Sequence, residues 1–253
     1  MIRLNNMARF KNNLYPVATI LAVLIVWQLA VTLGDVPGYI MPSCTDVIAA
    51  FIKDFPLIAS HTGYTLLESV IGFVCAVITA FVISLLMDAV PFIQKCLYPL
   101  LITSQTIPTI AIAPIVMIWF GFGIFPKVLL IVLVCFFPIA VSLFDGFRKV
   151  DQDHINLFRS MKASKWDMLW HLKLPSAMVN FFSGLKIAAT YMVMTAVISE
   201  WQGGLNGIGV YMVRAKSAYA LDKMFASIFV IVLLSIASIY VIDYIAKKVT
   251  HWK

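Results

Sequence analysis

Long apolar segments separated by short polar stretches dominate the sequence. Six of them can be drawn, at about residues 14–34, 61–87, 95–119, 127–147, 176–199 and 224–246. A helix needs about 20 apolar residues to cross a bilayer, and all six segments reach that length. The pattern predicts an all-α integral membrane protein with about six transmembrane helices. No small-residue cleavage site follows the first segment, so we expect it to be a retained span rather than a signal peptide.

Composition excludes an ordinary soluble domain. The chain of 253 residues is 62% hydrophobic and 12% charged, whereas soluble domains are roughly 45–50% apolar and about 25% charged. Once the six segments are removed, no soluble domain of useful size remains, so we expect a single transmembrane domain over residues 1–253. We expect the lipid bilayer to surround this domain. The net charge of +7 follows from membrane topology, and we expect no nucleic-acid partner.

The distribution of Lys and Arg predicts the orientation of the chain. With the N-terminus in the cytoplasm, 13 of these residues fall on the cytoplasmic side and 5 outside, Lys127 among the latter, while Lys186 lies within a span. Cytoplasmic loops carry the excess of positive residues. The sequence therefore predicts that both termini are cytoplasmic.

The third apolar segment combines prolines with polar residues, which is unusual for a span. Each proline removes a backbone donor and frees a carbonyl, so this helix should kink and present polar groups inward. Such a helix can line a polar translocation path, although prolines can also serve packing alone. The candidate path residues here are Ser104, Gln105, Thr106, Pro108 and Pro114, and Pro99 is a third proline.

Acidic residues in or beside the spans are further candidates. Glu68 lies in the second segment and should face the interior, either in the path or in a buried structural hydrogen bond. Glu200, beside Trp201, could be a gate, a docking contact, or an interfacial pair with the carboxylate in water. Asp145 should pair with Arg148 or Lys149.

Two loops on the outer side have distinct character. The stretch 35–60 contains an amphipathic run from Thr45 to Phe55 that Ser43 or Thr45 can cap. The stretch 200–222 carries four glycines, which permit tight, re-entrant backbone paths.

A charged stretch, residues 148–175, interrupts the apolar pattern and holds six of the 19 Lys and Arg residues. A helix should run from Asp151 or Asp153 to about Met161. A capping box of Ser164 and Asp167 should then start a second helix that stops at Pro175. Apolar side chains among the charges suit a protein-docking element, and an interfacial helix pair on lipid headgroups is the alternative.

The same stretch resembles the cytoplasmic EAA loop of ATP-binding-cassette importer permeases. That signature reads E-A-A, three residues, Gly, nine residues, then I-x-L-P, and the chain ends it with Leu172, Leu174 and Pro175. Counting back places Asn156, Leu157 and Phe158 at E-A-A and Lys162 at the glycine. The resemblance implies that residues 148–175 couple the permease to an ATPase, through Asn156, Leu157, Phe158, Arg159, Lys162, Ala163, Ser164, Trp166, Leu174 and Pro175.

The resemblance covers about residues 14–248 and points to nitrate/sulfonate/taurine-type permeases. The strings SQTIPTIAIAP, FFSGLKIAATY and SEWQGGLNGIGVYM look most like permeases for the pyrimidine precursor of thiamine, with riboflavin importers as close relatives. A sulfonate, taurine or nitrate importer is the alternative. The resemblance implies a type I importer permease fold in the bacterial cytoplasmic membrane. It also implies a second copy of the chain, a cytoplasmic ATPase and an extracytoplasmic substrate-binding protein as partners.

No catalytic chemistry is indicated by the residues themselves. The four His and four Cys residues have no metal-ligand or disulfide spacing, and no GxxxxGK[ST] string is present. We therefore expect no metal or cofactor on this chain, with ATP and magnesium on the partner ATPase, and the cysteines as small buried hydrophobes. An ion-coupled secondary carrier is an alternative of a different class, for which only Glu68 and Asp243 offer intramembrane acids.

Overall fold

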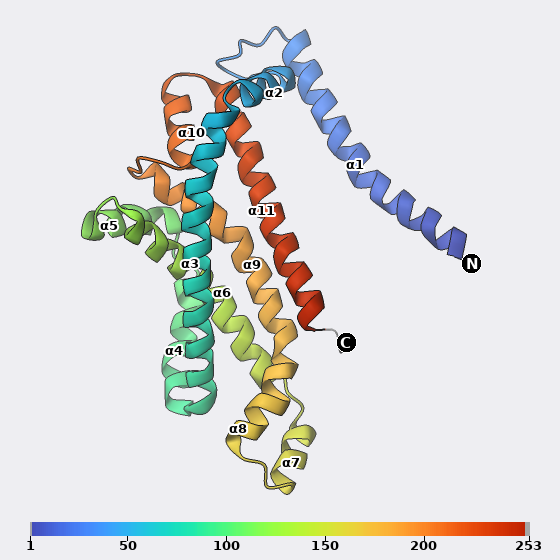
Figure 1. The fold of residues 1–253 in the computed structure, drawn as a ribbon, viewed down its shortest axis with the longest axis vertical. Coiled ribbons are helices and arrows are strands. Elements are labelled where there is room, and N and C mark those ends of the chain that lie inside the picture. Colours follow the sequence, from blue (N-terminus) through green and yellow to red (C-terminus); the bar gives the residue numbers. More distant parts are fainter. Residues whose placement is uncertain (1, 251–253) are drawn as a thin grey trace. The chain divides into compact units, whose positions relative to one another are not determined.

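The computed structural model describes residues 2–250, and side chains from Tyr15 onward. Within that range the secondary structure is entirely helical (Figure 1). The helices are α1 (Ile2–Leu33), α2 (Cys44–Lys53), α3 (Phe55–Ala89), α4 (Pro91–Ser104), α5 (Thr109–Phe120), α6 (Ile124–Arg148), α7 (Gln152–Ser160), α8 (Lys165–Met168), the π-helix η1 (Leu169–Lys173), α9 (Leu174–Trp201), α10 (Ile208–Ser217) and α11 (Leu221–Val249). They form two compact units. Unit 1 comprises residues 1–59 and 211–229, and unit 2 comprises 60–210 and 230–253.

The predicted number of spans is confirmed. By length and composition, five helical segments of the described chain can cross a membrane, and the bent pair α4–α5 makes a sixth when it is taken as one span. Each of the six apolar segments of the sequence corresponds to one of them. The helices extend further than the apolar runs, as α3 shows by starting at Phe55 rather than near residue 61.

The predicted kink in the third segment is confirmed as a complete break. The helix direction bends by 106° between α4 and α5. The intervening residues form a tight turn in which Ile107 N donates to Ser104 O over 3.2 Å. Pro108 caps α5 in an extended conformation and has no N–H to continue the helix. Pro99 and Pro114 lie inside their helices, so the break occurs at only one of the three prolines.

The core of unit 2 lies between α3, α6 and α9. Buried small residues such as Ala76 and Ala188 allow these helices to approach, and buried large ones such as Phe144 fill the space between them. α6 and α9 pack along each other (Figure 1). At Gly184 a Cβ would lie 2.7 Å from Cβ of Ser142 and 2.8 Å from Pro138 O. The α6–α9 contact therefore requires glycine at this position, as is typical of close helix pairs in membranes.

The second helix of the charged stretch does not stop at Pro175, contrary to the prediction. α8 continues through η1 into α9, so that residues 165–201 form one helical segment of 37 residues. A proline inside an α-helix leaves a carbonyl without its donor and clashes with the preceding turn. The π-helical turn at Leu169–Lys173 opens the backbone just before Pro175, and this allows the helix to continue.

In unit 1, α2 packs against α1. Of the two predicted candidates for the cap, Ser43 and Thr45, Ser43 is the cap, and it accepts a hydrogen bond from Asp46 N in a complete capping box. Trp27 Nε1 donates to Pro42 O over 3.1 Å. At the end of α2, Asp54 receives hydrogen bonds from Lys223 at 2.7 Å and Tyr211 at 2.9 Å. These bonds, with that of Lys223 the stronger, hold the pKa of Asp54 below its usual value.

Candidate functional site

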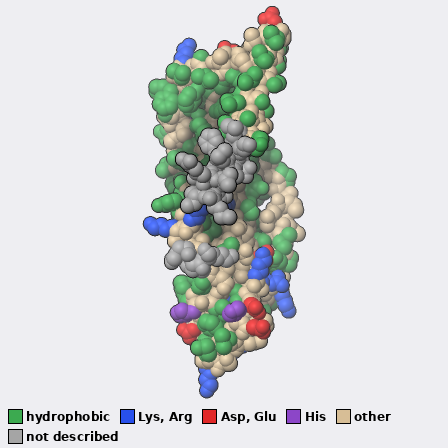
Figure 2. Space-filling view, turned by 90° about the vertical axis from the view of Figure 1, so that its right-hand side faces the viewer, with side chains coloured by type: hydrophobic (Ala, Val, Ile, Leu, Met, Phe, Trp, Pro, Cys, Tyr) green, Lys and Arg blue, Asp and Glu red, His purple; other side chains and the backbone are tan. Residues whose placement is uncertain are grey.

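The 148–175 loop has the helix–turn–helix form predicted from its sequence. Asp151 caps α7, accepting a hydrogen bond from Asp153 N at 2.9 Å. Ser164 and Asp167 form the predicted capping box at α8, with both reciprocal hydrogen bonds present. Figure 2 shows charged and histidine side chains around a hydrophobic patch at the end of unit 2 that α7 and α8 form. The loop therefore has a defined local structure with polar groups at its surface.

The turn between α7 and α8 uses a left-handed residue where the signature has glycine. Lys162 has φ of +55°, a region that glycine enters freely and other residues enter at a cost. Its N–H donates to Arg159 O over 2.9 Å, and Ala163 N donates to Phe158 O over 3.0 Å. The chain thus adopts the backbone form that favours glycine, with a lysine in its place.

Large apolar side chains project from this loop. Trp166 is 67% exposed and Leu157 is 55% exposed. Met161 and Trp170 are exposed to a similar degree, and the sequence reasoning did not place Trp170 among the candidates. Asn156 and Arg159 are also exposed, whereas Leu174 lies half-buried against the core of unit 2. Apolar groups exposed among charges are typical of a protein-binding surface.

A cavity of about 650 Å³ lies at the break between α4 and α5. Four of the predicted path residues line it, namely Ser104, Gln105, Thr106 and Pro108. Residues of α6 and α9 complete its wall, among them Phe137 and Tyr191, which the sequence reasoning missed. Pro114 is not among the lining residues. The break therefore creates a space that a straight helix would fill.

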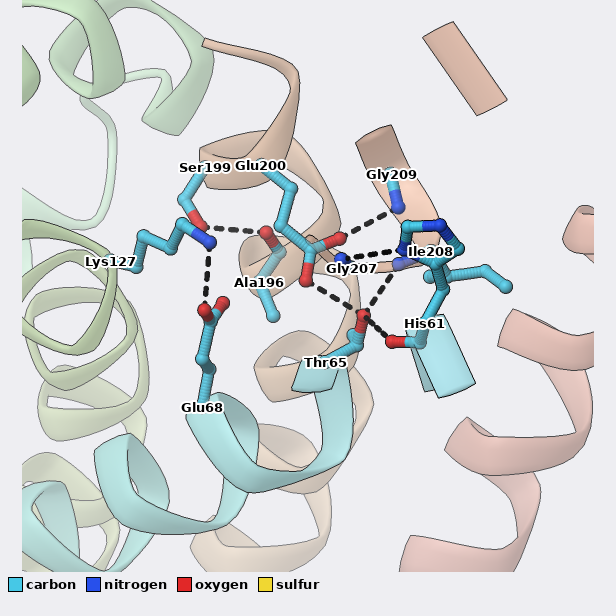
Figure 3. Close-up of polar contacts among 10 residues, drawn as sticks. All are labelled: His61, Thr65, Glu68, Lys127, Ala196, Ser199, Glu200, Gly207, Ile208 and Gly209. Carbon is cyan, nitrogen blue, oxygen red and sulfur yellow. Dashed lines mark hydrogen bonds and ion pairs between the residues drawn. The ribbon is translucent and has the colours of Figure 1, made fainter. Parts of the chain in front are cut away.

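The predicted path acids lie elsewhere, in a buried polar cluster (Figure 3). Glu68 of α3 accepts a hydrogen bond from Lys127 of α6 over 2.7 Å, and the two side chains are 7% and 5% exposed. Lys127, one of the cations predicted to lie outside, is therefore buried inside the protein rather than exposed in a loop. A buried charge requires a partner, and the pairing neutralises both groups. This leaves four cations in the stretches predicted to be external against 13 in those predicted to be cytoplasmic.

Glu200, at the end of α9, belongs to the same cluster. Its carboxylate accepts hydrogen bonds from Thr65 Oγ1 at 2.7 Å and Gly209 N at 2.6 Å. The carboxylate is not in water, contrary to the interfacial reading, since the residue is 1% exposed. Thr65 in turn accepts from Ile208 N at 2.8 Å, and His61 Nδ1 accepts from Gly207 N at 3.1 Å (Figure 3).

The cluster fixes the turn between α9 and α10. Three successive backbone N–H groups, those of residues 207, 208 and 209, are bound by side chains of α3 and α9. Gly207 has φ of +119°, and a Cβ there would lie 2.1 Å from the Glu200 carboxyl carbon. Glycine is thus required at this position. The predicted tight path of this loop is confirmed, and its cause is the buried carboxylate.

Three buried side-chain oxygens of α3 and α9 lack a partner in the described part of the chain, and one of them, on Glu68, belongs to this cluster. Glu68 Oε2, Ser69 Oγ and Thr195 Oγ1 are buried without a hydrogen-bond partner among the described residues. Such groups cost free energy in a rigid interior.

Two structural expectations about other residues are corrected. Asp145 accepts a hydrogen bond from Tyr98 at 2.9 Å rather than pairing with Arg148 or Lys149. Among the cysteines only Cys135 is buried, while Cys44 is half-buried and Cys75 and Cys96 are exposed in the single chain. In the described part of the chain, no group of three or more His, Cys, Asp or Glu side chains could hold a metal ion.

Comparison with known proteins places these features in context. Residues 72–251 match the family model described as "Binding-protein-dependent transport system inner membrane component". A "Probable ABC transporter permease protein" of Haemophilus influenzae is 34% identical over 235 residues, 93% of this chain and 96% of that protein. The formylaminopyrimidine transport permease protein ThiX of Halalkalibacterium halodurans is 32% identical over 248 residues, 98% of this chain and 99% of that protein.

Two further comparisons bear on substrate and fold. The riboflavin transport system permease protein RibX of Chloroflexus aurantiacus is 27% identical over 237 residues, 93% of this chain and 88% of that protein. Among solved structures, an amino acid ABC transporter crystallised with histidines matches with a TM-score of 0.63 at 14% identity. The match covers 81% of this chain and 98% of that one. The structural match concerns the fold alone.

Proposed function

Because the chain belongs to the family of binding-protein-dependent transport system inner membrane components, we propose that it imports a pyrimidine precursor of thiamine, with riboflavin as the related alternative. It is the permease subunit of an ATP-binding-cassette importer and a multi-pass protein of the bacterial inner membrane. Its fold is that of a type I importer permease. The subunit is not catalytic, and ATP hydrolysis belongs to a partner ATPase.

One observation supports the pyrimidine over other cargoes. The similarity to the formylaminopyrimidine permease amounts to 32% identity and extends over almost the whole of both chains. The taurine permease TauC of Escherichia coli shares 26% identity, so the margin between substrate classes is modest. A sulfonate, taurine or nitrate importer is thus the competing assignment.

The proposed orientation has both termini in the cytoplasm. Lys and Arg are in excess in the stretches on the same side of the membrane as the N-terminus, which supports this orientation. The burial of Lys127 with Glu68 removes one cation from the other side and so increases that bias. In this orientation the 148–175 loop faces the cytoplasm. The stretches 35–60 and 200–222 face outward, where a substrate-binding protein would deliver cargo.

The 148–175 loop is proposed as the contact with the ATPase. Its ordered α7–α8 pair and its exposed Trp166 and Leu157 offer the apolar groups that a groove on a partner would bury. A second copy of the chain would complete the translocation path. ATP and magnesium would bind on the ATPase and none on this chain. Closure of the ATPase dimer would then displace both loops and switch access to the path.

The pairing of intramembrane acids argues against an ion-coupled carrier. Asp243 is bonded to Lys186 within unit 2 and to Lys247 at 2.7 Å. Glu68 is bonded to Lys127. Glu68 and Asp243, the two acids that the sequence offers to such a carrier, are thus both bonded to lysines. Transport powered by a partner ATPase needs no such acid.

Uptake by the reconstituted importer tests the substrate. The permease would be placed in liposomes with its ATPase and its cognate binding protein. We expect ATP-dependent uptake of formylaminopyrimidine or hydroxymethylpyrimidine, and no uptake without ATP. Riboflavin, taurine and nitrate serve as competing cargoes. Uptake of taurine or nitrate with no uptake of pyrimidines would overturn the substrate, and uptake without ATP would favour a carrier.

Loss of the ATPase contact tests the role of the loop. Replacing Trp166 or Ala163 with aspartate should abolish co-purification of the ATPase and substrate-stimulated hydrolysis, because a charge would be forced into an apolar contact. Gln152→Asp is the matched control, since Gln152 is exposed on α7 outside the signature positions. If both Asp variants kept the ATPase and its stimulation, the docking role would be wrong.

A further inference from the structure

The cavity at the α4–α5 break is lined only by uncharged residues. Its polar lining comes from Ser104, Gln105, Thr106, Thr109 and Tyr191, and the remaining residues are apolar. Cavities of about 300–1,000 Å³ are typical of small-molecule sites, and this one measures about 650 Å³. We propose that it is a substrate site within the permease that accepts small neutral heteroaromatic rings. The proposal rests on the proposed function and names the chemistry by which this chain would select its cargo.

Several polar groups in the cavity are available to a ligand. In the described part of the chain, neither the Tyr191 hydroxyl nor the Thr109 hydroxyl has a hydrogen-bond partner. Gln105 Nε2 makes one long contact, 3.5 Å to Leu101 O, and its Oε1 accepts no hydrogen bond. By contrast, Ser104 and Thr106 donate to backbone carbonyls of α4 at 2.6 and 2.7 Å. The cavity therefore offers one amide acceptor and two hydroxyls that can donate or accept.

These groups complement an aminopyrimidine. Such a ring carries an exocyclic amino donor and ring-nitrogen acceptors, which match the amide oxygen and the hydroxyls. Phe137 and Tyr191 supply aromatic surface in the same wall, and aromatic rings favour stacked or edge-on contact with flat rings. The break supports the site, because a turn rather than a helix places residues 104–109 along one wall.

The lack of charge in the wall discriminates between cargo classes. A sulfonate or nitrate ion that leaves water needs a cation or several donors to replace its hydration. The lysines nearest in sequence to lining residues are Lys127 on α6, which is bonded to Glu68, and Lys186 on α9, which is bonded to Asp243. Transfer of a neutral ring from water into such an uncharged cavity costs little free energy, whereas transfer of an anion costs much. The cavity thus favours the pyrimidine over taurine or nitrate.

Binding to the permease without its binding protein tests this site directly. Hydroxymethylpyrimidine would be titrated into the permease–ATPase complex in nanodiscs and, in parallel, its carboxylate analogue. We expect binding of the neutral ring and at least about tenfold weaker binding of the anion. Tyr191→Phe and Gln105→Leu should each weaken binding about three- to tenfold, since each removes one hydrogen bond. Tyr240→Phe is the control, because Tyr240 is 71% exposed on α11 and does not line the cavity.

The outcomes separate this site from the substrate assignment. If the importer takes up pyrimidines but the isolated complex does not bind them, or binds the anion equally, the site is refuted and the substrate stands. The same follows if Tyr191→Phe and Gln105→Leu behave like Tyr240→Phe. If the complete importer takes up no pyrimidine, the substrate assignment fails, and the site fails with it. Normal ATPase activity of each variant shows that it is folded.

Discussion

Replacing Lys127 with methionine should destabilise the protein more than any surface substitution. Lys127 and Glu68 bond over 2.7 Å with side chains only 5% and 7% exposed. Removing the lysine leaves a buried carboxylate with no counter-charge, and one of its oxygens already lacks a partner. Breaking one side of a buried pair costs about 3–5 kcal/mol. With a shift of about 2–4 °C per kcal/mol for a chain of this size, Tm should fall by about 6–20 °C.

Thermal unfolding in detergent, followed by tryptophan fluorescence, measures the effect. A double variant in which Glu68 also becomes leucine should regain most of the lost stability, because replacement of a whole pair by apolar groups is close to neutral. Lys216→Met is the control, since Lys216 is exposed. A Tm of Lys127→Met within 2 °C of the control would refute the reasoning on the pair, and so would a double variant no more stable than the single one.

Three other substitutions test features of the backbone and of unit 1. Gly207→Ala should cost about 2–3 kcal/mol and reduce uptake, because its Cβ would meet the Glu200 carboxyl carbon at 2.1 Å; unfolding and transport both report it. Lys162→Gly should raise stability by about 1 kcal/mol, since it relieves the left-handed conformation at φ of +55°; the midpoint of thermal unfolding measures the gain. Asp54→Asn should lower stability at neutral pH, because the folded state depresses the pKa of Asp54. The carboxylate therefore stabilises the fold above the pKa that Asp54 has in the unfolded chain, and this stabilisation is lost as pH falls through the pKa that Asp54 has in the folded protein. Unfolding from pH 7 to 3 should therefore show the gap between wild type and variant closing below about pH 4.

Each of these three substitutions has its own control or its own contradicting result. Gly63→Ala matches Gly207→Ala, since a Cβ at Gly63 would meet nothing within 4 Å; equal behaviour of the two would mean that the turn tolerates a side chain. A loss of stability in Lys162→Gly would show that the lysine side chain contributes more than its backbone costs. A constant gap down to pH 3 would rule out Asp54 as the titrating group.

The spans could be predicted from sequence because lipid imposes a simple requirement. A run of apolar residues long enough to cross the bilayer must form a helix, as in α3 and α6. The capping box at Ser164 was equally predictable, since it depends on residues three apart. Local rules thus account for most of the elements.

Long-range pairing could not be predicted in this way. Lys127 reads as a loop cation because it stands at the edge of an apolar run, and only the approach of α3 to α6 shows that Glu68 neutralises it. In the same way Pro175 reads as a stop, whereas the π-helical turn before it carries the helix onward. The cavity depends on Phe137 and Tyr191 from two other helices. For Lys127 and for the cavity the deciding partners lie far away in the sequence, whereas for Pro175 the deciding feature is a local π-helical turn that the residue pattern does not indicate.

The continuous helix from α8 to α9 links the 148–175 loop to the buried polar cluster around Glu200. Residues 165–201 form one helical segment, about 55 Å long at 1.5 Å per residue. It begins at the capping box beside Trp166 and ends at the buried carboxylate of Glu200. The extra residue in the η1 turn gives this segment one place to change register. Conversion of that turn to α-helix would move α8 by about 1.5 Å and rotate it by about 100° relative to α9.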